Sequence, residues 1–447
     1  MKGIHAEARL LEQLTTLVGE TNVTYDPGYS TNSVYTLSAP FVVTPEREDQ
    51  VAAILQFASK QSLHVVPQGG GTKDAFGLNT TPVDLILSLK KLSGVLHHSV
   101  GDLIVTVLPG TTLLELQELL AHKGQFLPLD PAWPADATLG GIVASNASGP
   151  KRARYGSARD HLIAARIAFS DGTIIRTGAK VVKNVAGYDM NKLFIGAMGT
   201  LGVFTELTFK IRPLPATSGL IVLSATATNK LIKFQAALLD SHLEPCAFEY
   251  VSVHSELNIN EPAVYILFED VQSSVQYQMD WVLNAARELG IEVLQAWEGY
   301  EQTEPIMELL RCSVSNASLM SEDHTEVGLK LLTSISDVPD IMQYLELMGR
   351  KEALDLQCYG GLYTGISHVR LYSSLGRDDS MIHSIKKIRA DIERLNGHVI
   401  VQCAPGYIRS AISVWGNSNE GIEVMRGIKQ KFDPTNNLNL GRYVGGI

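Results

Sequence analysis

The sequence predicts an α+β fold in which a two-part mixed domain is followed by a ferredoxin-like α+β cap domain. Short apolar runs alternate with amphipathic segments over residues 1–215 of the 447-residue chain, which indicates strands alternating with helices. The breaker Arg212-Pro213-Leu214-Pro215 ends this region. Residues 219–298 follow in the order strand, helix, strand, strand, helix, strand, which is that of a ferredoxin-like unit. We therefore place a domain boundary after residue 215.

The first half of the N-terminal domain begins with an amphipathic helix and a short strand at 41–43. Thr44 is expected to cap the next helix, with Pro45 at its first position, because both residue types are frequent at those places. The apolar stripe of this helix is predicted to comprise Val51, Ile54, Leu55 and Ala58. Apolar and alternating residues predict further strands at 64–66, 83–89 and 103–107.

The second half of this domain carries clear helix and turn signals. Thr112 and Glu115 have the spacing of a capping box, and Gly124 is expected to stop that helix. Thr138 is expected to cap another helix. Asp171-Gly172 predicts a hairpin turn between two strands. The domain is therefore predicted to have two strand-rich halves.

The cap domain is expected to span residues 216–410. Its strand and helix order recurs between 328 and 403, which indicates one or two ferredoxin-like units. A last helix at 420–432 is ended by Asp433-Pro434. We expect residues 411–447 to form this helix and a tail that returns to the N-terminal domain.

Composition excludes several classes of protein. A formal net charge of −10 argues against a nucleic-acid binder, which needs a basic face. No apolar run is long enough for a membrane span, and the N-terminus lacks the pattern of a secretory signal. The four cysteines stand too far apart for a zinc or iron–sulfur site, so we expect reduced, mostly buried thiols, no metal and a cytoplasmic protein. The cluster Lys151, Arg152 and Arg154 is either a solvated loop or a counter-charge for a bound anion.

The sequence lacks both standard nucleotide signatures, the G-x-G-x-x-G pattern and the phosphate loop. It has instead a triple glycine, Gly69-Gly70-Gly71, followed by Thr72. Successive amides in such a turn can bind a diphosphate, although a plain tight turn explains the glycines equally well.

Two further glycine-rich stretches lie in the same domain, at 130–149 and 183–206. The early residues of the helix after Thr138 are so small that another group must fill the space beside them. Close packing of two protein elements is one explanation, but a flat ring system accounts better for the length of the run. Three such stretches in one domain favour a large, phosphate-bearing cofactor.

The stretches PQGGGT, LDP, DATLGGIVASNASG, RYGSARD, KNVAGYD, GTLGVFTEL and FDPTNNLNLGR also resemble a known family. Their residues and order are similar to the FAD-binding domain of the vanillyl-alcohol oxidase and para-cresol methylhydroxylase (PCMH) superfamily. Within it, the sequence most resembles the FAD-binding E subunits of bacterial glycolate oxidases. The likeness covers about residues 40–215 and the last fifteen.

This resemblance implies FAD as cofactor, with the first glycine loop around its pyrophosphate and the second stretch along the flavin and ribityl chain. The FAD-binding residues that it implies are Gly69, Gly70, Gly71, Thr72, Asp136, Ala137, Thr138, Gly140, Gly141, Ser145, Asn146, Ser148, Gly149, Gly202 and Val203. Relatives with covalent FAD commonly carry a histidine where this chain has Thr72, so the resemblance implies noncovalent FAD.

The catalytic groups are less defined. Relatives that oxidise D-2-hydroxy acids alone carry a histidine-rich metal motif and a Glu-His pair, neither of which is visible here. Oxidation of a hydroxy acid needs a cation for the carboxylate and a base for the hydroxyl proton. Arg311, at a helix end, and His368 with Arg370, on one strand face, are the candidates. A solvated arginine and a surface ion pair are the alternative interpretations.

We therefore expect the FAD-binding subunit of a glycolate or 2-hydroxy-acid oxidase complex. The resemblance implies two partners, a catalytic flavoprotein subunit and an iron–sulfur subunit, which would receive the electrons. The chain is expected in the cytoplasm, either free or bound through these partners at the inner face of the membrane. Two alternatives remain open: a stand-alone FAD-dependent dehydrogenase of another small substrate, and a non-catalytic flavin-binding scaffold.

Overall fold

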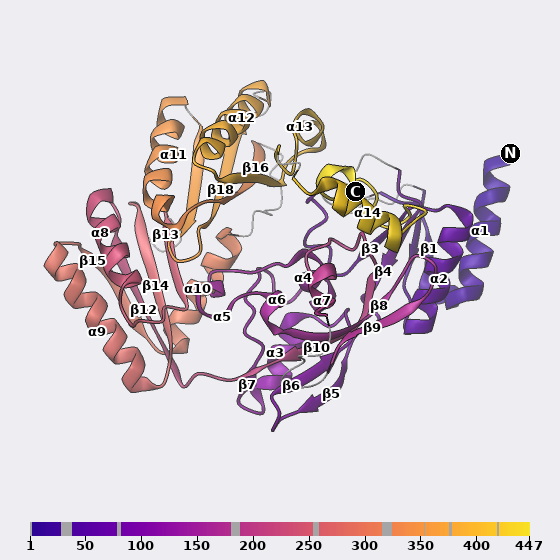
Figure 1. Ribbon diagram of the computed structural model, residues 1–447, viewed down its shortest axis with the longest axis horizontal. Helices are drawn as coiled ribbons and strands as arrows, with labels where there is room; N and C mark the ends of the chain where they lie inside the picture. Colours follow the sequence, from indigo (N-terminus) through magenta and orange to yellow (C-terminus); the bar gives the residue numbers. More distant parts are fainter. Residues whose placement is uncertain are drawn as a thin grey trace.

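The computed structural model places an N-terminal two-sheet domain beside a cap domain built on one large sheet (Figure 1). It describes residues 2–27, 38–77, 82–179, 188–253, 259–314, 324–352, 354–374, 378–417 and 420–447. In Figure 1 the indigo and purple N-terminal domain lies at the right and centre, and the orange and salmon cap domain lies at the left. The yellow C-terminal segment lies against the N-terminal domain, although the two are far apart in the sequence.

The first sheet of the N-terminal domain has the strand order β1-β2-β4-β3. Its strands are β1 (Val23–Tyr25), β2 (Phe41–Val43), β3 (Val65–Gln68) and β4 (Leu85–Ser88). β4 pairs in parallel with both β2 and β3, and all four of its residues are buried. The helices α1 (Lys2–Val18) and α2 (Glu48–Gln61) contact each other, and their buried residues share one core with this sheet. Because β3 ends at Gln68, the triple glycine begins at the end of a parallel strand.

The predicted apolar stripe of α2 is buried, but its predicted cap is wrong. The helix starts at Glu48, and the side chain of Gln50 accepts hydrogen bonds from the backbone amides of Glu46 and Arg47. Thr44 and Pro45 therefore lie before the helix. The physical reason is that a glutamine at the third helical position satisfies the free amides without any help from a threonine.

The second sheet is antiparallel, with the order β5-β6-β10-β8-β9. Its strands are β5 (Val95–Ser99), β6 (Ile104–Val107), β8 (Leu162–Ala168), β9 (Ile174–Gly178) and β10 (Val203–Lys210). The helix α3 (Leu113–Ala121) begins at the predicted capping box of Thr112 and Glu115. The short helices α4 (Leu139–Ser145), α5 (Arg152–Tyr155), α6 (Ala158–His161) and α7 (Asn191–Phe194) connect the strands, and β7 (Gln125–Phe126) pairs with β11 (Arg212–Pro213).

The cap domain contains both predicted copies of the strand and helix order. The first consists of β12 (Thr217–Ser224), α8 (Thr228–Leu239), β13 (Ala247–Val251), β14 (Ala263–Asp270), α9 (Gln272–Leu289) and β15 (Val293–Glu298). The second consists of β16 (His324–Leu332), α11 (Val338–Glu352), β17 (Asp355–Gly361), β18 (Ile366–Ser374), α12 (Asp378–Arg394) and β19 (His398–Cys403). The helix α10 (Tyr300–Val314) links the two copies.

The two copies form one continuous sheet, with the order β15-β12-β14-β13-β17-β18-β16-β19. They join where β13 pairs with β17, through Glu249 opposite Gly361 and Tyr250 opposite Gly360. The helices α8, α9, α11 and α12 contribute to the core on one face of the sheet. The other face is left for the N-terminal domain and α10, and side chains from several strands line a cleft on that side.

The C-terminal segment is anchored on the N-terminal domain. After α13 (Gly406–Ala411) and α14 (Ile422–Phe432), Leu438 forms a parallel bridge with Val65. The guanidinium of Arg442 donates hydrogen bonds to the carbonyl oxygens of Lys73, Asp74 and Phe76, at 2.7, 3.0 and 2.9 Å. The tail therefore fixes the segment that follows the triple glycine.

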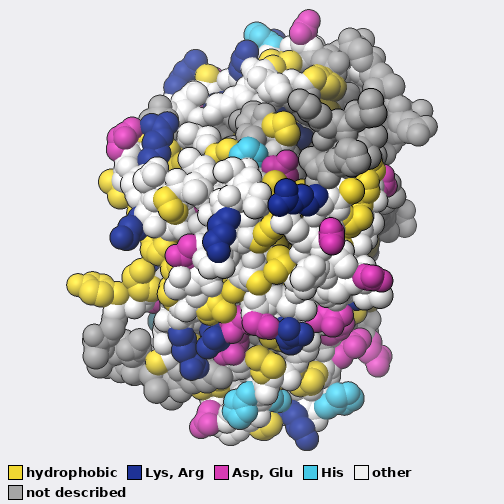
Figure 2. Space-filling view, turned by 90° about the vertical axis from the view of Figure 1, so that its right-hand side faces the viewer, with side chains coloured by type: hydrophobic (Ala, Val, Ile, Leu, Met, Phe, Trp, Pro, Cys, Tyr) yellow, Lys and Arg dark blue, Asp and Glu magenta, His cyan; other side chains and the backbone are white. Residues whose placement is uncertain are grey.

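The surface carries charges of both signs. Figure 2 shows Lys and Arg side chains interspersed with Asp and Glu on the face that it displays. No helix among the described residues is long and apolar enough to cross a membrane. Three of the four cysteines, Cys246, Cys358 and Cys403, are buried, and all four are free thiols.

Candidate active site

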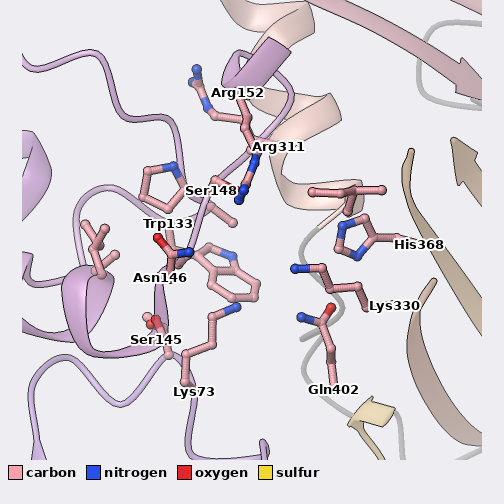
Figure 3. Close-up of a pocket in the computed structure, with 18 of the residues that line it drawn as sticks. Lys73, Trp133, Ser145, Asn146, Ser148, Arg152, Arg311, Lys330, His368 and Gln402 are labelled. Atoms are coloured by element: carbon pink, nitrogen blue, oxygen red, sulfur yellow. Dashed lines mark hydrogen bonds between the residues drawn. The ribbon is translucent and has the colours of Figure 1, made fainter. Parts of the chain in front are cut away.

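A cleft with about 1120 Å³ of empty space, part of it open to solvent, lies between the N-terminal domain and the cap sheet. Figure 3 shows side chains from both domains directed into it, with Ser145, Asn146 and Lys73 on one side and Lys330, His368 and Gln402 on the other. A second recess of about 490 Å³ adjoins it and is lined by the triple glycine. Thr72, Lys73, Gly141 and Ser145 line both, so the two spaces share a wall.

The glycine loop tolerates no side chain at two of its positions. A Cβ on Gly70 would lie 1.8 Å from the backbone oxygen of Asp136, and one on Gly69 would lie 2.0 Å from Oγ1 of Thr138. Gly71 has a φ of 84°, in the region that favours glycine. The loop therefore lies directly on the start of α4 with its backbone facing the recess, which suits close approach of a phosphate group.

The second small-residue stretch forms the wall of the cleft. Thr138 caps α4 as predicted, since its Oγ1 accepts a hydrogen bond from the amide of Gly141 at 3.3 Å. The cleft or its recess is lined by Ala137, Thr138, Gly141, Ser145, Asn146, Ser148 and Gly149. Oδ1 of Asn146 is buried without a hydrogen-bond partner among the described residues. Because a buried acceptor rarely stays unpaired, this atom indicates a donor on a bound group.

Four of the predicted FAD-binding residues do not line the cleft or its recess. Gly140 packs against Pro109, and Gly202 packs against Ile167, so close packing within the protein explains both glycines. Val203 is buried in β10, and the side chain of Asp136 is exposed. Residues 180–187, which include most of the KNVAGYD stretch, lie outside the described residues.

The C-terminal tail supplies residues that the sequence did not single out. Asn439 and Arg442 line the recess beside the glycine loop. Nδ2 of Asn439 donates to the carbonyl oxygen of Met198 at 2.5 Å, while its Oδ1 is buried without a partner among the described residues. The asparagine-rich composition of the tail was the available signal. Together with the glycine loop and Asn146, this second unpaired amide oxygen fits a large ligand rich in hydrogen-bond donors, such as FAD.

The candidate catalytic residues separate into two groups. Arg311, on α10, and His368, on β18, both line the cleft. The side chain of Arg311 is only 10% exposed and its guanidinium donates to Glu304 at 2.7 Å, so it is not a solvated helix end. Arg370 does not line the cleft. Its guanidinium donates to the carbonyl oxygen of Cys312 at 2.8 Å and lies 3.9 Å from Glu326, which assigns it a structural role.

The charge cluster after the small-residue wall also separates. Lys151 pairs with Glu269 at 2.8 Å, and Arg154 pairs with Asp270 at 3.1 Å, so these two residues join the N-terminal domain to the cap domain. Neither lies in a solvated loop or in the cleft. Only Arg152 lines the cleft, where it donates a hydrogen bond to Ser148 at 3.1 Å.

The cleft collects further cations that sequence reasoning missed. Lys73 follows the glycine loop, and Lys330 lies on β16 directly opposite His368 of β18. In Figure 3 the amines of both lysines and the guanidinium of Arg311 are directed toward the same space. Among the described residues, no carboxylate lies within 4.0 Å of either lysine amine. The cleft therefore has an excess of positive charge, which suits an anionic ligand.

Burial and mutual repulsion change the protonation of these groups. Burial, with the charges of Arg152 and Lys73, lowers the pKa of Lys330 to about 8. Burial, with the charges of Lys330 and Lys73, lowers the pKa of His368 well below its ordinary value. His368 is therefore a neutral imidazole at neutral pH and can accept a proton, whereas Lys330 is largely charged.

The affinity of the cleft for anions should fall as pH rises through about 8, because Lys330 loses its charge there. We expect oxalate to bind the wild type about tenfold more weakly on the alkaline side, the effect of losing ~1.5 kcal/mol from one charge-assisted hydrogen bond. Lys330→Arg keeps the charge and should remove the part of this loss that is due to Lys330, and Lys330→Gln should already bind weakly at neutral pH. Calorimetric titration with oxalate at a series of pH values checks this prediction. If the loss of affinity is the same in Lys330→Arg as in the wild type, another group causes it.

Two carboxyl groups lie at the Arg311 end of the cleft. Asp130, 8% exposed, accepts hydrogen bonds from the amides of Gly149 and Lys151 at 3.0 and 2.7 Å. Burial raises the pKa of Asp130 to about 6 despite these bonds and the charge of Arg311. Glu249, on β13, is 6% exposed and lines the cleft. The described residues contain no group of three or more His, Cys, Asp or Glu that could hold a metal ion.

Solved structures share this fold. p-Cresol methylhydroxylase, in a structure with substrate bound, superposes over 99% of this chain and 97% of its own with a TM-score of 0.76 and 13% sequence identity. Alkyldihydroxyacetonephosphate synthase superposes over 96% of this chain and 84% of its own with a TM-score of 0.72 and 17% identity. At these identities the likeness shows the fold alone, and the predicted fold class is confirmed.

Curated proteins align along nearly the full chain at low identity. Glycolate oxidase subunit GlcD of Bacillus subtilis is 25% identical, with 96% of each chain aligned. A mitochondrial cytochrome-linked D-lactate dehydrogenase of Arabidopsis thaliana is 27% identical, over 97% of this chain and 80% of its own. D-2-hydroxyglutarate dehydrogenase of Stutzerimonas stutzeri is 23% identical, over 97% of this chain and 98% of its own.

Two family models match the two parts of the molecule. The FAD binding domain model matches residues 39–178, which contain the glycine loop and the small-residue wall. The model of the C-terminal domain of FAD linked oxidases matches residues 228–443, which contain the cap sheet and most of the C-terminal segment. Together with the unpaired amide oxygens beside the glycine loop, these matches identify FAD as the cofactor of the cleft. The chain belongs to the PCMH-type FAD-binding oxidase family.

Proposed function

We propose that this chain is the FAD-binding subunit of a complex that oxidises glycolate or a related 2-hydroxy acid. The observation that carries the proposal is the composition of the cleft. Its N-terminal wall is made of small residues with an unpaired amide oxygen, and its cap wall presents Arg311, Lys330 and the neutral imidazole of His368. The similarity to a glycolate oxidase subunit and to two hydroxy-acid dehydrogenases supports the same substrate class.

The residues that would hold FAD are those that line the cleft wall and its recess. The backbone of Gly69, Gly70 and Gly71 would approach the pyrophosphate, and Asn146 and Asn439 would accept hydrogen bonds from the cofactor. When bound, FAD supplies an acceptor for the hydride that leaves the hydroxyl-bearing carbon.

The side chains of the cap wall would position the substrate and take its proton. Lys330 and Arg311 are placed to bind the carboxylate of a hydroxy acid, because both are cations directed into the cleft. His368, neutral at neutral pH, would accept the hydroxyl proton at one of its ring nitrogens. Lys73 faces them from the opposite wall and adds positive charge where negative charge develops.

The electrons would pass to partner subunits, for which we propose a catalytic flavoprotein and an iron–sulfur protein. This part of the proposal rests on the resemblance to glycolate oxidase E subunits and on the similarity to a glycolate oxidase subunit. A cytoplasmic location, reached with these partners, belongs to the same proposal.

Anaerobic reduction tests the proposal. The chain is purified alone and with the proteins that accompany it, its flavin spectrum is recorded, and glycolate or lactate is added, with acetate as the control that lacks a hydroxyl group. We expect bound flavin and its bleaching by hydroxy acids in both samples, with the electrons leaving the bleached flavin only when partners are present. Steady turnover by the chain alone with an artificial acceptor would indicate a stand-alone dehydrogenase, no bleaching would indicate a scaffold, and absence of flavin would contradict the proposal.

The flavin should be held without a covalent bond, because Thr72 has a hydroxyl group where some relatives carry a linking histidine. Precipitation with acid should release all flavin into the supernatant as unmodified FAD, identified by chromatography. Flavin that remains in the protein pellet after denaturation would show a covalent link through another residue.

A further inference from the structure

The buried carboxyl group of Glu249 has no role in the mechanism above. It is 6% exposed, belongs to β13 at the junction of the two halves of the cap sheet, and lines the cleft. Its cross-strand neighbour on β17 is Gly361, so no side chain covers it from that strand, and its neighbour on β14 is Tyr265. Among the residues that the structure describes, no hydrogen-bond donor or cation pairs with its oxygens. A carboxyl group in this environment is costly unless it finds a partner, so its presence points to a bound ligand.

The surroundings of Glu249 set its protonation. The charge of Asp130 acts on it from the N-terminal domain. Arg311 of α10, Lys330 of β16 and His368 of β18 line the same cleft, the last two from strands beyond β17. Burial, and then the charge of Asp130, raise the pKa of Glu249 well above its ordinary value. This environment favours the neutral carboxylic acid, which has one O–H group to donate.

We propose that Glu249 binds the substrate by donating a hydrogen bond from its protonated carboxyl group to a carboxylate or hydroxyl oxygen of the hydroxy acid. This deepens the proposed function and rests on it. No bond is formed or broken at Glu249 and its proton stays on the carboxyl group. The proton of the substrate goes instead to His368, so the cleft would hold one neutral acceptor and one neutral donor, set by opposite pKa shifts in the same space.

Oxalate is the probe, because it resembles a hydroxy acid but cannot be oxidised. Its binding to the flavin-loaded chain is measured by calorimetry from neutral to alkaline pH. The background is Lys330→Arg, which removes the titration of Lys330. Glu249→Gln keeps a donor that cannot ionise, and Glu249→Ala removes the donor. A matched control is Glu346→Gln, on the opposite face of the sheet, where Glu346 hydrogen-bonds to Tyr250.

We expect oxalate to bind Glu249→Gln within about threefold of the background and with no loss at alkaline pH, whereas the background should lose affinity there as Glu249 ionises. Glu249→Ala should bind about tenfold more weakly at every pH, the effect of one lost hydrogen bond. Equal oxalate affinity in the background, Glu249→Gln and Glu249→Ala would overturn the proposal. So would a loss in Glu249→Gln as large as in Glu249→Ala.

The same samples distinguish failure of this inference from failure of the proposed function, because oxalate binding does not depend on turnover. If oxalate binds but no hydroxy acid bleaches the flavin of the complex, the proposed function fails and the role of Glu249 is still decided. If Glu249→Gln does not fold, infrared difference spectra of the background protein report the carboxyl group directly. Its protonated C=O band should shift when oxalate binds, and an unshifted or absent band would contradict the proposal.

Discussion

Gly70→Ala should abolish FAD binding. The added Cβ would lie 1.8 Å from the backbone oxygen of Asp136, and the three nearest atoms are all backbone atoms of Asp136, so no flexible side chain can move aside. The loop must then leave the start of α4, which takes its amides away from the recess. We expect the flavin content of the purified protein to fall by at least about tenfold, since a loss of ~1.4 kcal/mol already has this effect.

The control for this prediction is Gly427→Ala. Gly427 is exposed in α14, and a Cβ there meets no atom within 4 Å. Alanine should raise stability by at most about 1 kcal/mol and leave flavin content unchanged. Absorbance of flavin relative to protein measures both variants. A full complement of FAD in Gly70→Ala would show that the loop does not hold the pyrophosphate.

Lys429→Met should cost about 3–5 kcal/mol of the free energy of unfolding, the usual effect of breaking a buried ion pair. The ammonium of Lys429 is 4% exposed and donates to Asp433 at 2.7 Å and to the carbonyl oxygens of Thr200 and Leu438, both at 2.8 Å. Without it the carboxylate of Asp433, which is 0% exposed, would be left without its counter-charge. Urea unfolding measures the change.

The matched control is Lys431→Met, two positions along the same helix, where the lysine is exposed and the change should be within about 0.5 kcal/mol. Flavin retention should fall in Lys429→Met as well, because the tail that Lys429 anchors carries Asn439 and Arg442 to the recess. Equal urea midpoints in the two variants would show that the buried pair contributes nothing to stability.

Local chemistry accounts for what the sequence could predict. The capping box of Thr112, the cap at Thr138 and the turn at Asp171-Gly172 depend only on neighbouring residues, and each lies where its pattern placed it. The wrong cap at Thr44 has the same origin, because the predicted cap and the observed cap at Arg47 stand three residues apart and Gln50 satisfies the free amides. A single sequence does not rank such signals.

Long-range pairing accounts for what could not be predicted. Each ferredoxin-like copy has a readable strand order, but the pairing of β13 with β17 joins residues more than a hundred positions apart and follows from no local pattern. That junction brings Glu249 to the cleft, and the register of β16 with β18 brings Lys330 opposite His368. Lysines and glutamates in strands usually face solvent, so these residues carry no signal until the sheet is assembled.

The charge cluster shows the same limit at the boundary between domains. A solvated loop and an anion site were the two expected roles for Lys151, Arg152 and Arg154, yet two of the three cations pair with carboxylates of the cap domain. Their partners, Glu269 and Asp270, lie more than a hundred residues away at the end of β14. Only the folded arrangement shows which cation remains for the cleft.

The most direct test of the proposed site is a crystal structure of the flavin-loaded chain with oxalate. We expect the isoalloxazine ring against the wall formed by residues 137–149, the pyrophosphate at Gly69–Gly71, and oxalate between the ring and the side chains of Arg311, Lys330 and His368. Oxalate outside this space, or FAD bound without contact to the glycine loop, would show that the cleft is not the site proposed.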